Sequence, residues 1–245
     1  MKFPVIQWKI IFWTTIFAIA MGFLETSVVV YMRALLYPGG FSFPLAAIPQ
    51  SLALTEILRE AATLVMLIGI GYLIGKNGIT RFAYFLYAFA VWDIFYYVFL
   101  KLLIHWPESW FTWDILFLIP ITWVGPVIAP IIVSLTMILL AFVILYFNSE
   151  VESVNLNRIE WIFLIVGSIL LIVSFTLDYS AYILEHYRFA DIWSVPNESM
   201  LKLAMKYIPR QFNWPLFLMA ELIIVVGIGL FFNRIIKINK SQLTK

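Results

Sequence analysis

Residues 52–75 read LALTEILREAATLVMLIGIGYLIG, an apolar run that is long enough to cross a lipid bilayer as a helix. Three charged residues, Glu56, Arg59 and Glu60, lie in its first turns. A charge in hydrocarbon is costly, so such residues normally face one another, water or a ligand. Because their spacing is i, i+3 and i+4, the three share one face of the helix. The stretch therefore predicts a membrane span with a polar site near one end.

Long apolar runs recur along the rest of the chain, separated by breaks that contain Gly, Pro or Asn. The 245 residues are 63% hydrophobic and 12% charged, against about a quarter charged in an ordinary soluble domain. This composition predicts an all-α, polytopic membrane protein with a single transmembrane domain. We expect six spans, at residues 8–32, 52–75, 82–103, 126–147, 159–178 and 215–233.

The composition also excludes several kinds of chemistry. The chain has no cysteine, so it has no disulfide, thiolate nucleophile, Cys-ligated zinc or iron–sulfur cluster. Its two histidines are too few for the His-rich di-iron sites of membrane enzymes. A net charge of +2 with no Lys/Arg-rich segment does not favour nucleic acid as a partner. We therefore predict no metal, no cofactor and no nucleic acid.

Basic residues in the short connections and tails predict the orientation in the membrane. Lys76, Arg81, Arg158 and Arg234 all fall on the side of the N-terminus. This distribution favours cytoplasmic termini for a multi-pass protein of the cell membrane. We expect that membrane to be a bacterial inner membrane. The first apolar run continues to Met32, which is too long for the core of a cleaved signal peptide, so we expect the run to be retained.

In this orientation, charged residues from five of the six predicted spans fall at a similar depth, in the outer leaflet. Two tyrosines follow Asp93 by three and four positions, and Asp114 lies beside a tryptophan-rich segment. We predict one charged cavity in which Glu60 and Asp93 act as acid or base. The residues predicted to bind the substrate are Glu25, Arg33, Glu56, Arg59, Tyr96, Tyr97, Lys101, Asp114, Asp178 and Glu221.

Three functions fit such a cavity. In the first, which we favour, it binds or modifies a lipid or isoprenoid-like substrate, because Arg33, Arg59 and Lys101 could hold an anionic headgroup. In the second, the charges pair with one another and merely pin the helices of a structural or assembly subunit of a membrane complex. In the third, the carboxylates carry a small cation or protons. Membrane lipids are the expected partners, and a homo-oligomer or a larger membrane complex stays open.

Two segments outside the spans are unusual. Residues 106–126 combine tryptophans with Pro120, Gly125 and Pro126, which predicts either a re-entrant or broken segment or an interfacial helix that leads into the fourth span. Residues 197–208 have an apolar face opposite a stripe of Glu198, Lys202 and Lys206. This second pattern predicts an amphipathic helix at the outer interface.

Overall fold

The computed structural model describes residues 7–119, 121–148, 154–188 and 198–243 of the chain. Within these ranges, six helices are long and apolar enough to cross a membrane, and the predicted all-α polytopic fold is confirmed. The helices are α1 (Trp8–Leu36), α2 (Gln50–Ile74), α3 (Gly78–Ile104), α4 (Ile128–Asn148), α5 (Arg158–Leu184), the short α6 (Glu198–Ala204) and α7 (Trp214–Leu243). Large apolar side chains such as Leu35 and Leu73, each 81% exposed, cover their outer faces, as expected for contact with lipid.

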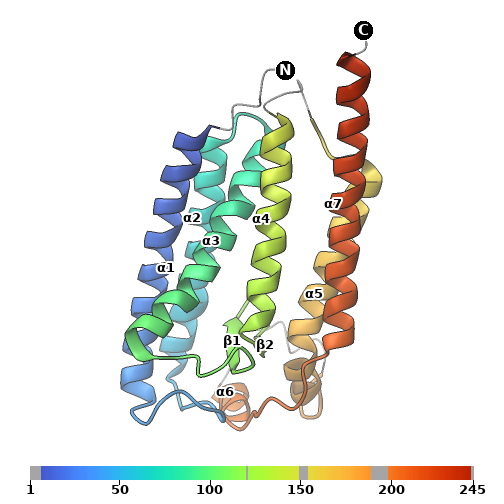
Figure 1. Ribbon diagram of the computed structural model, residues 1–245. Helices are drawn as coiled ribbons and strands as arrows, with labels where there is room; N and C mark the ends of the chain where they lie inside the picture. The colour runs from blue at the N-terminus through green and yellow to red at the C-terminus, as the bar shows by residue number, and fades with distance from the viewer. Residues whose placement is uncertain (1–6, 120, 149–153, 189–197, 244–245) are drawn as a thin grey trace.

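The helices form a group of four and a pair. In the first group α1, α2 and α4 all pack against α3, while α5 pairs with α7, which also contacts α4 (Figure 1). Small residues permit the close approaches, as is usual between membrane helices. A Cβ on Gly167 of α5 would clash with the Ile224 side chain of α7, so a larger residue at that position would require the packing to shift.

The two ends of the bundle differ. Figure 1 shows the beginning of α1 and the end of α7 at one end, and α6 with both strands at the other. The two ends of the helical chain therefore lie on the same side of the bundle, as an even number of spans requires. That this side is the cytoplasmic one stays a prediction.

Residues 113–126 form a β-hairpin in place of the interfacial helix that we considered. Strand β1 (Trp113–Phe117) pairs antiparallel with β2 (Trp123–Pro126), and Asp114 lies opposite Gly125. The helix expectation is wrong here, because Gly125 and Pro126 are poor helix formers while β-pairing satisfies the backbone polar groups. The alternative expectation, a break in the helical structure, is closer to what is observed. Pro120 lies outside the described residues.

The predicted amphipathic helix is present but shorter than expected. The described helix runs from Glu198 to Ala204, whereas the prediction extended to residue 208. Asn197, the predicted first residue, lies outside the described residues. The chain then turns so that Tyr207, which is 1% exposed, can donate a hydrogen bond of 2.6 Å to Asp178 at the end of α5. Burial of this tyrosine explains why the helix does not continue. Residues 149–153 of the polar linker also lie outside the described residues.

Candidate functional site

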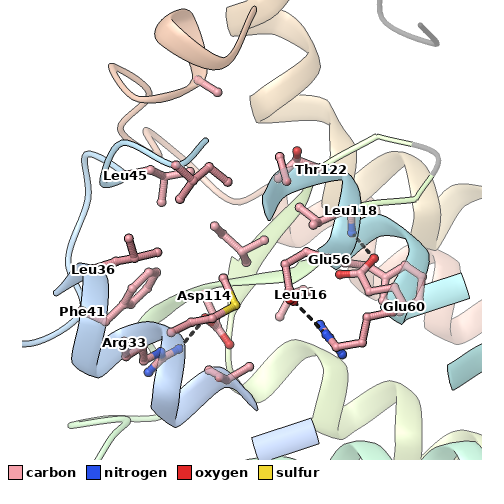
Figure 2. Close-up of a pocket in the computed structure, with 18 of the residues that line it drawn as sticks. Arg33, Leu36, Phe41, Leu45, Glu56, Glu60, Asp114, Leu116, Leu118 and Thr122 are labelled. Carbon is pink, nitrogen blue, oxygen red and sulfur yellow. Dashed lines mark hydrogen bonds and ion pairs between the residues drawn. The ribbon is translucent and has the colours of Figure 1, made fainter. Parts of the chain in front are cut away.

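A cavity of about 290 Å³ lies at the end of the bundle that holds the hairpin. Its walls come from α1, α2, α3, β1, the last turns of α5, helix α6 and the connection between α1 and α2. Figure 2 shows apolar Leu36, Phe41 and Leu45 along one side, with charged side chains below and opposite them. The lining is therefore amphiphilic, because apolar and ionised groups share one space.

Arg33 and Asp114 form a buried ion pair in this cavity. The Nη2 atom of Arg33 donates to Oδ1 of Asp114 over 3.1 Å, and Tyr97 donates to the other carboxylate oxygen over 3.4 Å. The guanidinium also lies 3.8 Å from the ring centroid of Trp106 and 4.4 Å from that of Phe41, which are cation–π distances. Its Nη1 atom is buried and has no hydrogen-bond partner among the described residues.

Burial of Asp114 has a measurable electrostatic consequence. Removal from water raises the pKa of this carboxyl to about 6, although Arg33 beside it acts in the opposite direction. Asp114 therefore takes up a proton in the mildly acidic range, and Arg33 then loses its ionised partner.

Arg59 links α1 to α2 through two carboxylates. Its Nε donates to Glu56 over 2.8 Å, one turn earlier on the same helix, and Nη1 is in ion-pair contact with Glu25 of α1. The sequence predicted that Arg59 would lie between carboxylates, and the i, i+3 pair with Glu56 follows from that spacing. The contact with Glu25 depends on how α1 and α2 lie relative to one another.

Glu60 directly follows Arg59 on α2 and has a different environment. Its Oε2 accepts a 2.8 Å hydrogen bond from the backbone N–H of Leu118, at the end of β1. Within the described part of the chain, no Lys or Arg lies within ion-pair distance of this carboxylate, which is 7% exposed. Glu60 is thus a cavity carboxylate that is anchored by a backbone amide and not by a cation.

Asp93, Tyr96 and Tyr97 of α3 also line the cavity. Asp93 accepts a 2.8 Å hydrogen bond from the hydroxyl of Ser134 on α4. The two tyrosine rings pack edge to face, with centroids 4.9 Å apart. The three side chains form the inner end of the site, towards the centre of the bundle.

Three residues predicted for the same site do not line this cavity. The amine of Lys101 donates to the backbone carbonyls of His105 and Pro107 and so closes the end of α3. Asp178 accepts from Tyr207 and from two backbone amides. Glu221 accepts from Thr136, which joins α7 to α4. Similar depth in the membrane did not bring these residues together, because they lie on different faces of the bundle.

Other lining features could not be assigned from the sequence. The segment between α1 and α2 contributes Phe41, Leu45 and Ala46, and the Tyr37 hydroxyl accepts the Ala46 N–H over 2.8 Å. The sequence also does not indicate that the Leu118 amide and the Ser134 hydroxyl donate to cavity carboxylates, because a backbone donor and a single serine have no recognisable pattern. The Gly and Pro residues between α1 and α2 did predict a break between the two helices, but they did not predict that this connection lines the cavity.

The donor set of the cavity favours binding of a polar headgroup and proton exchange more than metal chemistry. Its described lining contains five carboxylates and two arginines. In the described ranges, no group of three or more His, Asp or Glu side chains is arranged to hold a metal ion. In comparisons with protein-family models, curated proteins and solved structures, the chain matches none.

Proposed function

We propose that this protein is a multi-pass membrane protein that binds the headgroup of a lipid or isoprenoid-like amphiphile in the cavity at the hairpin end of the bundle. One observation carries the proposal: Arg33 lines a cavity that is partly apolar and partly charged, and its Nη1 is buried and unpartnered among the described residues. A buried donor without an acceptor is destabilising. An oxyanion of a bound headgroup would supply that acceptor, and the apolar lining would receive part of the chain.

A finer proposal is that the bound amphiphile is modified by acid–base chemistry. Glu60 and Asp93 line the same cavity, and each accepts one hydrogen bond from a neutral donor, which leaves the second carboxylate oxygen for a ligand. A carboxyl within reach of a substrate can give or take a proton. Reaction products in vesicles made with a total lipid extract, detected by mass spectrometry with wild-type protein and absent with Asp93→Asn and Glu60→Gln, would support this step. Products that persist in both variants would contradict it.

The binding proposal is tested by blocking the cavity. Ala46 lines it, whereas Ala34 on α1 is exposed to the surroundings near the same end, so Ala46→Trp and Ala34→Trp form a matched pair. Each variant is purified in mild detergent, and bound lipid is counted by native mass spectrometry. We expect Ala46→Trp to lose the retained lipid and Ala34→Trp to keep it. Equal retention by both variants would exclude the cavity as the binding site.

The ion pairs of Arg59 favour a second role for part of this site. Because Arg59 is held by Glu25 and Glu56, these three residues resemble a clamp between α1 and α2 more than a free binding group. If the charges serve to hold the helices together, as in a structural subunit, Arg59→Gln should weaken the packing of α1 against α2. If it lowers the free energy of unfolding without changing lipid retention, Arg59 is a clamp and not a headgroup ligand.

A further inference from the structure

We infer that the headgroup bound in this cavity carries both an oxyanion and an ammonium group, as in an aminophospholipid, with the oxyanion at Arg33 and the ammonium at Glu60. This inference rests on the proposed function and names the class of ligand. It departs from the expectation of a purely anionic headgroup that Arg33, Arg59 and Lys101 would hold.

The charges that line the cavity argue against a purely anionic ligand. Carboxylates outnumber arginines by five to two among the described lining residues. Arg59 is already shared by Glu25 and Glu56, and Lys101 donates to backbone carbonyls outside the cavity. A headgroup with negative charge alone would therefore meet the incompletely satisfied Arg33 and two carboxylates, Glu60 and Asp93, that no arginine pairs with, and like charges repel strongly where water is scarce.

Arg33 supplies the place for the oxyanion. The residue is 8% exposed, and its guanidinium is fixed by Asp114 on one edge and by the Trp106 and Phe41 rings on its faces. Arg33 lines the cavity, and its Nη1 atom is buried with no acceptor among the described residues. A group that enters the cavity beside the guanidinium would give Nη1 an acceptor after a small shift of the side chain. A phosphate oxygen is a strong acceptor for such a donor.

Glu60 supplies the place for the ammonium. Its Oε2 is held by the Leu118 amide, and among described residues nothing donates to Oε1. A buried carboxylate normally has a cation as partner. Nearby Arg59 does not serve, since its contacts are to Glu25 and Glu56. A primary ammonium would complete the environment of Glu60 with a charge-assisted hydrogen bond.

The two subsites are spaced for one headgroup that lies along β1. Arg33 is tied to Asp114 and Glu60 to Leu118, and these anchors are four residues apart on an extended segment. At about 3.3 Å per residue, the anchors are at most about 13 Å apart. Figure 2 shows Arg33 and Glu60 on opposite sides of the cavity, with Asp114 and Leu116 between them.

Competition between lipids that differ only in the headgroup tests the inference. The protein is placed in nanodiscs with equal amounts of dioleoyl phosphatidylethanolamine and dioleoyl phosphatidylglycerol, and the lipids it retains on release into detergent are counted by native mass spectrometry. We expect wild-type protein to retain phosphatidylethanolamine about tenfold over phosphatidylglycerol, which corresponds to one charge-assisted hydrogen bond of about 1.4 kcal/mol. Dioleoyl phosphatidylcholine, whose ammonium has no N–H, should compete poorly.

Variants separate the two subsites. Glu60→Gln should abolish the preference for phosphatidylethanolamine while some lipid is still retained. Arg33→Gln should reduce both lipids about equally, and Arg33→Lys provides a charged alternative if the glutamine variant does not fold. Glu185→Gln is the matched control, because Glu185 lies at the same end of the bundle in an exposed pair with Arg210. Thermal unfolding of each variant establishes that the fold persists.

The outcomes distinguish this inference from the proposed function. Equal retention of the two lipids by wild-type protein, or an unchanged preference in Glu60→Gln, would overturn the dual-charge headgroup while leaving lipid binding in place. No difference in lipid retention between Ala46→Trp and Ala34→Trp would instead overturn the binding function itself.

Discussion

The Nη2 atom of Arg33 lies 3.1 Å from Oδ1 of Asp114, and this pair joins α1 to strand β1 across 81 positions of sequence. Both residues are buried, at 8% and 2% exposure. The pair therefore orients a cavity-lining guanidinium and also attaches the hairpin to the helical bundle. These two roles can be separated by experiment.

Asp114→Leu should destabilise the protein strongly. The change removes the carboxyl that accepts from Arg33 and Tyr97 and leaves Arg33 buried without a partner, and removal of one partner of a buried pair typically costs about 3–5 kcal/mol. Reversible unfolding in mixed micelles measures the loss. The double variant Arg33→Met/Asp114→Leu should recover most of it, because no charge is then left unpaired. As a control, Glu185→Gln in the exposed pair with Arg210 should cost about 0–1 kcal/mol. Similar losses for Asp114→Leu and Glu185→Gln would show that the buried pair has no special role.

Asp114 should also make stability depend on pH between about 4 and 6. The folded state raises the pKa of this carboxyl to about 6, chiefly by burial, whereas the unfolded chain has the ordinary value of about 4. Between these values the folded protein holds a proton that the unfolded chain has released. The contribution of Asp114 to stability therefore falls as the pH rises from about 4 to about 6, and then levels off.

The pH effect is measured as the difference in unfolding free energy between wild type and Asp114→Asn at each pH. Arg33→Gln should move the transition of Asp114 to higher pH, because the charge that favours its ionised form is gone. Infrared difference spectra of the carboxyl band follow this titration directly. A transition at the ordinary value near pH 4 would contradict burial of Asp114.

Gly167→Ala should weaken the contact between α5 and α7. A Cβ at this position would clash with Ile224 and lie 3.0 Å from the carbonyl oxygen of Ala220, so the Ile224 side chain or the two helices must shift. Overpacking of this kind costs about 1–3 kcal/mol. In the matched control, Gly69→Ala on α2, a Cβ meets nothing within 4 Å, and the change should be neutral or slightly stabilising. Equal effects in unfolding experiments would mean that α5 and α7 do not pack in this register.

The orientation in the membrane is testable because the chain has no cysteine of its own. Gly78 and Glu108 are both exposed. Gly78 is the first residue of α3, and Glu108 follows the other end of that helix. We expect an impermeant maleimide to label Glu108→Cys in intact cells and Gly78→Cys only after the membrane is opened. The reverse pattern would place the cavity in the cytoplasmic leaflet.

The charged residues that line the cavity were all among those predicted from the sequence, but most of their partners were not. Glu56 and Arg59 pair as the helical spacing requires, since contacts within a helix follow from the sequence alone. Arg33 was expected near the other charges, yet its partner proved to be Asp114 of the hairpin. Lys101 was assigned to the cavity only from its predicted depth. In the structure its amine donates to backbone carbonyls at the end of α3.

The sequence by itself determined the membrane class and the six spans, because the length of an apolar run and the cost of a charge in hydrocarbon decide which segments can cross a bilayer. The tertiary structure alone decided which charges meet. Helix rotation and the β-hairpin bring Asp114 to Arg33 and the Leu118 amide to Glu60, whereas they turn Asp178 and Glu221 to other partners. The physical reason is range: hydropathy and helical periodicity act over a few turns, but the cavity is built from segments that only packing brings together.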